Sequence, residues 1–117
     1  MTPAEMFAEA QRFSTGIDHA LESLREHVEQ SAVAERDYRK AKAKAWAQAK
    51  TEDMLAKEKE AWVNAQTADL RFERDLADGM KQGALEALRS RRAQLSKCQT
   101  FANVERAEMD LARTAPT

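Results

Sequence analysis

Lysine and arginine cluster between residues 36 and 50, where six cations accompany a single acidic residue. At about 100° per residue, a helix would gather most of these cations within about 140° and place Tyr38 and Ala45 on the opposite, packing side. Trp46 falls at the edge of the cationic arc, whereas Lys42 projects into the packing arc, as a snorkelling side chain or an interface contact. Because cations bind phosphates and an aromatic ring stacks bases, this stretch is a candidate surface for single-stranded nucleic acid. Its candidate residues are Arg36, Arg39, Lys40, Lys42, Lys44, Trp46 and Lys50.

Charge alternates in blocks along the chain, and the alternation allows a second interpretation. The net charge is −5 over residues 1–35, +5 over 36–50, −4 over 51–78 and +4 over 79–99. If the chain folds back near Thr51, blocks of opposite sign lie side by side and set the register of the helices. The cations would then serve only subunit assembly, as in a helical structural, scaffold or adaptor protein. A single tryptophan such as Trp46 is also more often a core or interface residue than a stacking one.

Catalytic and metal-binding patterns are missing from the sequence. His19 and His27 are eight residues apart on one side of a helix, with no third ligand at a fixed spacing. No glycine-rich phosphate-binding loop occurs. The single cysteine, Cys98, excludes a disulfide framework and a cysteine-based zinc site. We therefore expect no enzymatic activity, no metal site and no cofactor.

Composition predicts the fold class. The chain has 117 residues with only three Gly and two Pro, too few turn-formers for an all-β or βαβ fold, and 33% of its residues are charged. Its length suits one small domain. It has neither a run of about 18 apolar residues nor a secretory leader pattern, so we expect a soluble, cytoplasmic protein that makes no membrane contact.

Apolar periodicity and helix-ending residues divide the chain into elements. Residues 1–16 should form a short N-terminal helix or tail that ends at Ser14-Thr15-Gly16. One helix should then cover about 17–49 and another about 54–113, with a break at residues 50–53 and with 79–83 as the place for a bend. Residues 114–117 should be a disordered tail. The predicted fold is all-α: one helical domain over 17–113, built as a long antiparallel helical hairpin with an extended C-terminal oligomerisation helix.

An apolar stripe along the second half of the chain predicts association. Its members fall within an arc of about 120° on a helix, and much of the arc lies beyond the reach of a first helix that starts at residue 17. Arg91 lies in the middle of this stripe, where an arginine is usually paired across an interface. We expect further copies of the chain to cover the stripe in a homo-oligomer. The interface residues are Leu76, Met80, Ala84, Leu88, Arg91, Leu95, Cys98 and Ala102.

Two segments resemble the UvsY family, the recombination mediators of tailed bacteriophages. The more specific is GALEALRSR at 83–91, followed by QLSKCQ at 94–99, which is similar to the family's C-terminal helix. The other is YRKAKAKAW at 38–46, which is similar to the family's basic-Ala-basic motif followed by an aromatic residue. The resemblance covers roughly residues 36–105.

The resemblance implies a non-enzymatic protein of DNA recombination, replication and repair. Such a protein would bind single-stranded DNA, assemble through its C-terminal helix into a ring-like homo-oligomer, and help to load a RecA-type recombinase onto DNA covered by single-strand-binding protein. Carried over to this chain, the DNA-contacting pair falls on Lys40 and Lys42, with Lys44 in an alternative frame.

Overall fold

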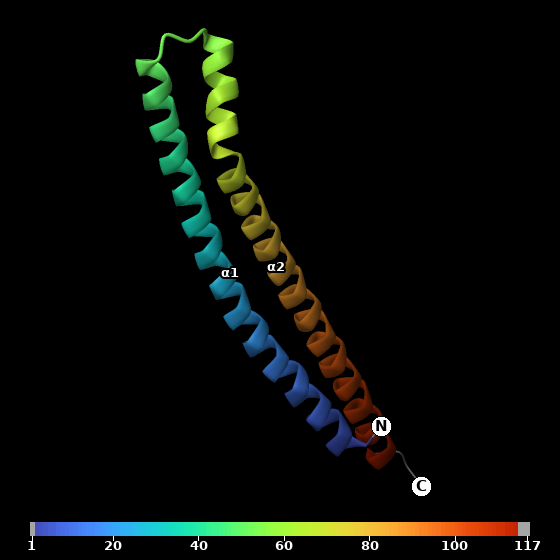
Figure 1. The fold of residues 1–117 in the computed structure, drawn as a ribbon. Coiled ribbons are helices and arrows are strands. Elements are labelled where there is room, and N and C mark those ends of the chain that lie inside the picture. The colour runs from blue at the N-terminus through green and yellow to red at the C-terminus, as the bar shows by residue number, and fades with distance from the viewer. Residues whose placement is uncertain (1, 115–117) are drawn as a thin grey trace. The chain divides into compact units, whose positions relative to one another are not determined.

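Two long helices make up the part of the chain that the computed structural model describes, residues 2–114. Helix α1 is Pro3–Thr51 and helix α2 is Ala56–Thr114 (Figure 1). No strand occurs within these residues, so the all-α prediction is confirmed. The predicted disordered tail begins at the last residue of α2, and residues 115–117 lie outside the described part.

A capping box starts α1 close to the beginning of the chain. The Thr2 hydroxyl accepts a hydrogen bond from the Glu5 backbone N–H (3.2 Å), and the Glu5 carboxylate accepts one from the Thr2 N–H (3.0 Å). Pro3 occupies the first helical position, where a missing N–H removes no intrahelical bond. The prediction of a separate element over residues 1–16 is therefore wrong, because α1 starts at Pro3 and continues to Thr51.

Gly16 lies inside α1 and does not end a helix. No glycine among the described residues has a positive φ, so none adopts the left-handed conformation of a helix C-cap. A Cβ at Gly16 would instead lie 2.5 Å from Nη1 of Arg91. Because Gly16 has no side chain, Arg91 of α2 can lie across α1 at this point. The sequence alone does not distinguish a glycine that allows such a close approach from a glycine that ends a helix.

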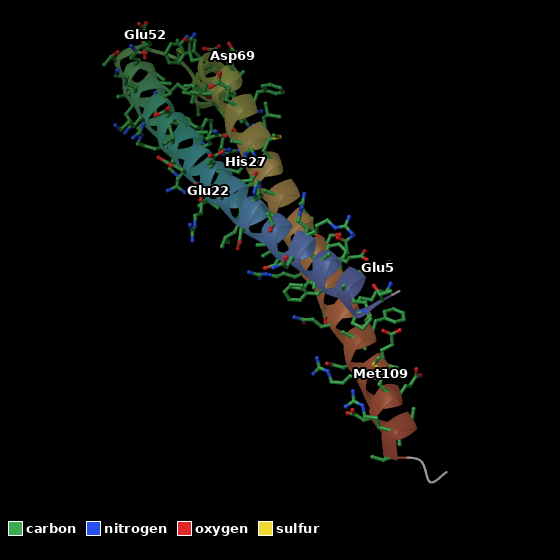
Figure 2. All side chains as sticks on the ribbon, turned by 90° about the horizontal axis from the view of Figure 1, so that it is seen from below. Glu5, Glu22, His27, Glu52, Asp69 and Met109 are labelled. Carbon is green, nitrogen blue, oxygen red and sulfur yellow. The ribbon has the colours of Figure 1, made fainter. Side chains whose placement is uncertain are left out.

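The turn between the helices lies two residues further along the chain than the predicted break at 50–53. Residues 52–55 connect α1 to α2, and Glu52 is at this end of the molecule (Figure 2). The Thr51 hydroxyl donates to the Gln48 carbonyl (2.7 Å) at the end of α1. The Glu58 carboxylate accepts a hydrogen bond from the Leu55 N–H (3.4 Å) at the start of α2, which satisfies one of the free donors of a helix N-terminus.

The helices pack as two units, each formed by one part of α1 and one part of α2. The first, here called the hairpin unit, is Leu24–Ala84 and contains the turn. Its core cluster is Ala45, Ala49 and Val63, with the two tryptophans packed against it. Small side chains at these positions let the helix axes approach closely. The Thr67 hydroxyl is buried one turn further along and donates to the Val63 carbonyl (2.8 Å).

The second unit, here called the terminal unit, joins residues up to Ser23 with residues from Leu85 onward. Its buried side chains include Met6 and Ala20 of α1 and Leu88 of α2. The Cys98 thiol lies 3.8 Å from the Met6 carbonyl, to which it donates. The first turns of α1 thus lie beside α2 and cover residues that the sequence assigned to contacts with other copies.

Helix α2 runs without interruption through the two glycines that marked the expected bend. Both Gly79 and Gly83 are exposed, and neither would bring a Cβ within 4 Å of another group. Each costs about 1 kcal/mol relative to alanine in a helix interior, a penalty that the rest of a 59-residue helix outweighs.

Replacing Gly16 with alanine should raise the free energy of unfolding by up to about 1 kcal/mol, because alanine favours the helix and only the flexible end of Arg91 must move. Chemical denaturation followed by circular dichroism measures the change. Ala8→Gly, at an exposed position two turns earlier, is the matched control and should lower stability by about 1 kcal/mol. A loss of stability in Gly16→Ala would mean that residue 16 ends a helix.

Candidate nucleic-acid interface

Five of the six cations between residues 36 and 50 lie along one side of α1 in the hairpin unit, and the sixth, Lys42, lies at the edge of the packing side. All six are exposed, and together they are called the basic stripe: Arg36, Arg39, Lys40, Lys42, Lys44 and Lys50. The other side of this segment is held against α2 by Tyr38, Ala45 and Ala49, which are buried. The 3.6-residue periodicity that buries these three side chains turns the basic stripe towards solvent.

Lys42 is exposed, although the helical wheel directs it towards the packing side. Its ammonium nitrogen lies 5.7 Å from the centroid of the Tyr38 ring. The aliphatic stem can follow the edge of the helix pair while the charged end remains in water, as expected for a snorkelling lysine. Of the two roles left open for Lys42, the structure supports snorkelling.

The arginines and the lysines of the basic stripe differ in their partners. Arg36 pairs with Asp37 (3.2 Å) and Arg39 pairs with Glu35 (2.8 Å), both partners being on α1 itself. Among residues 2–114, the four lysines of the stripe have no carboxylate within 4.0 Å, and no acid of the 51–78 block pairs with the stripe. The lysines are therefore the part of the stripe with charge available for a phosphate.

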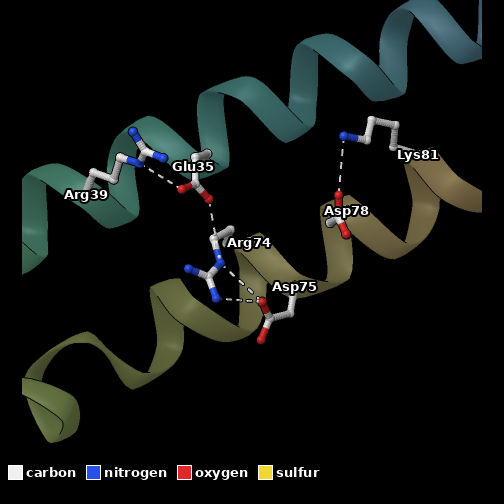
Figure 3. Close-up of polar contacts among 6 residues, drawn as sticks. All are labelled: Glu35, Arg39, Arg74, Asp75, Asp78 and Lys81. Carbon is white, nitrogen blue, oxygen red and sulfur yellow. Dashed lines mark hydrogen bonds and ion pairs between the residues drawn. The ribbon is translucent and has the colours of Figure 1, made fainter.

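A polar network centred on Arg74 joins the two helices behind the basic stripe. The Arg74 guanidinium lies 3.6 Å from Glu35 and 2.9 Å from Asp75, and Glu35 also binds Arg39 (Figure 3). The guanidinium carbon is 4.4 Å from the centroid of the buried Tyr38 ring, within the range of a cation–π contact.

The charge on Arg74 is permanent in this position. The hydrogen bond from its guanidinium to Asp75 is the main cause that raises the pKa of Arg74, and the charge of Glu35 acts in the same direction. Arg74 thus fixes the rotation of α1 about its own axis, and with it the outward direction of the stripe. Sequence alone does not single out Arg74, and the only signal for this contact is a tyrosine, Tyr38, on the packing side of the facing helix.

Trp46 is half-buried and packs against the cluster of Ala45, Ala49 and Val63, with Trp62 on the same cluster. It occupies the edge position that the wheel predicts, but its contacts are those of a core residue. Packing explains this ring without a nucleotide, so the stacking role expected for Trp46 has no support in the geometry.

The predicted oligomer-interface residues divide between the two units. In the terminal unit Leu88 is only 3% exposed, and Leu95, Cys98 and Ala102 are partly buried within the chain itself. Arg91 is exposed, with its side chain lying across Gly16 of the same chain. In this half of the stripe α1 buries Leu88 and partly covers the other apolar members, so the expectation that other copies bury Leu88 is wrong. The first turns of α1, which begins fourteen residues earlier than predicted, add to this cover, and the Met6 carbonyl lies beside Cys98.

The other three predicted oligomer-interface residues, Leu76, Met80 and Ala84, lie in the hairpin unit. Ala84 is half-buried, but Leu76 and Met80 are 56% and 51% exposed. A leucine and a methionine left in water forgo roughly 1.5–3 kcal/mol each relative to burial. These two side chains are therefore still available for contact with another molecule.

The histidines do not assemble into a metal site. No group of three or more potential metal ligands occurs within residues 2–114. His19 is exposed, and His27 is half-buried with its Nδ1 lacking a hydrogen-bond partner in the described part of the chain. Neither described helix has a stretch apolar enough to cross a lipid bilayer.

Comparison of the chain with protein-family models, with curated proteins and with solved structures finds no match.

Substituting Trp46 separates its two roles. Trp46→Ala should lower the free energy of unfolding by about 2 kcal/mol through lost packing and change the affinity for a labelled oligonucleotide by less than about twofold, because a packed ring contributes little stacking. Lys44→Ala is the matched control, with stability unchanged to within about 0.5 kcal/mol and a clear loss of affinity. A Trp46→Ala chain of unchanged stability that no longer binds would show that the ring stacks on bases.

Proposed function

We propose that the protein binds single-stranded DNA through the basic stripe. The observation that carries the proposal is the exposure of four lysines on α1, three on one side and Lys42 at the edge of the packing side, with no carboxylate partner among residues 2–114 and with a packed helix that holds their spacing. Lysines on a rigid helix contact successive phosphates of a flexible strand without reading its bases. Binding should therefore be weakly dependent on sequence and strongly dependent on salt.

The resemblance to the UvsY family extends this proposal to a cellular role. In that role the protein is a homo-oligomeric recombination mediator that helps to load a RecA-type recombinase onto DNA covered by single-strand-binding protein. The DNA-contacting pair carried over from the family, Lys40 and Lys42, falls on the basic stripe. A mediator of this kind should shorten the lag before a RecA-type recombinase hydrolyses ATP on covered single strands, and a chain without the stripe lysines should not.

A helical scaffold or adaptor protein is the second candidate. The observation in its favour is the local pairing of Arg36 and Arg39, which shows that part of the stripe is satisfied without DNA. In that case the stripe lysines would only keep the surface solvated. The parent chain would not bind single strands, and replacing these lysines would not change that.

Replacing Lys40, Lys42 and Lys44 together with alanine should abolish most strand binding. Four phosphate contacts give a slope of about −3 for the logarithm of the binding constant against the logarithm of salt concentration, and a single remaining contact gives about −1. Fluorescence anisotropy with a labelled oligonucleotide at several salt concentrations measures both slopes.

The control for this experiment removes the same charge from the terminal unit, by replacing Arg89, Arg92 and Lys97 with alanine. These three residues are exposed, and the control chain should keep the parent's salt slope. Equal losses in both chains would show that only net charge matters, and a parent chain with no salt dependence would overturn the proposal.

A further inference from the structure

Helix α2 carries an apolar stripe on the side that faces away from α1 in the hairpin unit. Phe72 and Leu76 are 68% and 56% exposed, and Met80 is 51% exposed. With the exposed alanines and glycines on the same side, these residues form what is called here the outer stripe. Its members are Ala61, Ala65, Ala68, Phe72, Leu76, Gly79, Met80 and Gly83, all exposed.

The packing of the chain itself does not require the glycines of the outer stripe. Neither Gly79 nor Gly83 has a positive φ, and nothing lies within 4 Å of the position that a Cβ would take. Each nevertheless weakens the helix by about 1 kcal/mol relative to alanine. A glycine that is unnecessary within the chain and faces open space is suited to the close approach of a second helix.

The order of large and small residues in the outer stripe is complementary to itself. Phe72, Leu76, Gly79 and Gly83 follow one another at steps of four, three and four, the spacing of a helix–helix seam. If a second copy runs antiparallel about a twofold axis, Phe72 lies opposite Gly83 and Leu76 lies opposite Gly79. Each large side chain then meets a glycine. In a parallel pair, phenylalanine would meet phenylalanine and glycine would meet glycine, which leaves gaps beside each glycine layer.

The outer stripe offers large apolar side chains to such an interface. Phe72, Leu76 and Met80 are each more than half exposed, and burying such a side chain contributes roughly 1.5–3 kcal/mol.

Charge also favours association through α2 rather than α1. The basic stripe faces away from α2 and the outer stripe faces away from α1, so the two stripes lie on opposite sides of the hairpin unit. Two copies joined through their outer stripes keep their basic stripes apart, which avoids repulsion between like charges.

We infer that the outer stripe is the contact between two antiparallel copies of this chain, with Phe72 and Leu76 of each copy packed onto Gly83 and Gly79 of the other. The dimer presents two basic stripes on opposite sides. The presentation of two DNA-binding surfaces by one dimer rests on the proposed function, but the pairing of the two copies does not depend on DNA.

Cysteine cross-linking tests both the contact and its direction. In a Cys98→Ser background, Phe72→Cys and Gly83→Cys chains should form a disulfide when mixed and oxidised, because residues 72 and 83 of different copies face each other. Each chain alone should remain largely uncross-linked, because the two copies of residue 72 would be roughly 16 Å apart along the helix axis. Cross-linking of each variant with itself would show a parallel pair and overturn the inference, as would the absence of cross-links in the mixture.

Sedimentation at several protein concentrations tests the energetics without new cysteines. Phe72→Ser should weaken self-association at least about tenfold, because the side chain is lost from both copies. Phe101→Ser is the matched control, since Phe101 is 66% exposed on α2 in the terminal unit, and its dissociation constant should equal the parent's. Circular dichroism confirms that both variants remain helical. A parent chain that is monomeric at all concentrations, or equal weakening by both variants, would overturn the inference.

The two proposals can fail separately. The chain with Lys40, Lys42 and Lys44 replaced should still form the mixed disulfide in the Cys98→Ser background, because these lysines lie on the other side of the hairpin unit. Cross-linking without strand binding would overturn the proposed function and support the pairing. Strand binding by a parent chain that does not self-associate would support the proposed function and overturn the pairing.

Discussion

Tyr38 and Arg74 form the contact that determines which way the rest of the hairpin unit faces. The ring is buried, the guanidinium lies over it, and Glu35 and Asp75 hold the guanidinium from both helices. A two-helix fold has no third element to fix the rotation of either helix about its axis, and the apolar contacts are mostly alanines, which specify rotation weakly. A polar group that must be satisfied at one rotation supplies that specificity.

Once that rotation is fixed, the two sides of the hairpin unit acquire different chemistry. The residues of α1 that cannot reach α2 are largely lysine and arginine, and those of α2 that cannot reach α1 include phenylalanine, leucine, methionine and glycine. The basic stripe suits a polyanion and the outer stripe suits another apolar surface. A molecule with these two sides can associate with itself and bind a strand without either contact excluding the other.

Residue types and periodicity were enough to predict much of this structure. Two long helices, a turn within about two residues of the predicted break at 50–53 and the outward direction of most of the basic stripe follow from helix propensity, the scarcity of turn-formers and the position of Tyr38 and Ala45 on the wheel. Lys42 was placed inward because a wheel locates the Cβ and says nothing of where a long side chain ends.

The errors have one common cause, the competition between a local signal and a tertiary contact. Gly16 predicts a stop, but its cost of about 1 kcal/mol is smaller than what the capping box at Thr2 and the burial of Met6 and Ala20 contribute. The early start of α1 places Met6 beside Cys98, whereas Leu76 stays exposed because it lies on the side of α2 that faces away from α1. A single glycine, interpreted without its tertiary setting, thus changes how much of α2 is expected to remain open to a partner. If the proposed strand binding is correct, self-association through that open side of α2 decides whether copies can add their affinities for DNA.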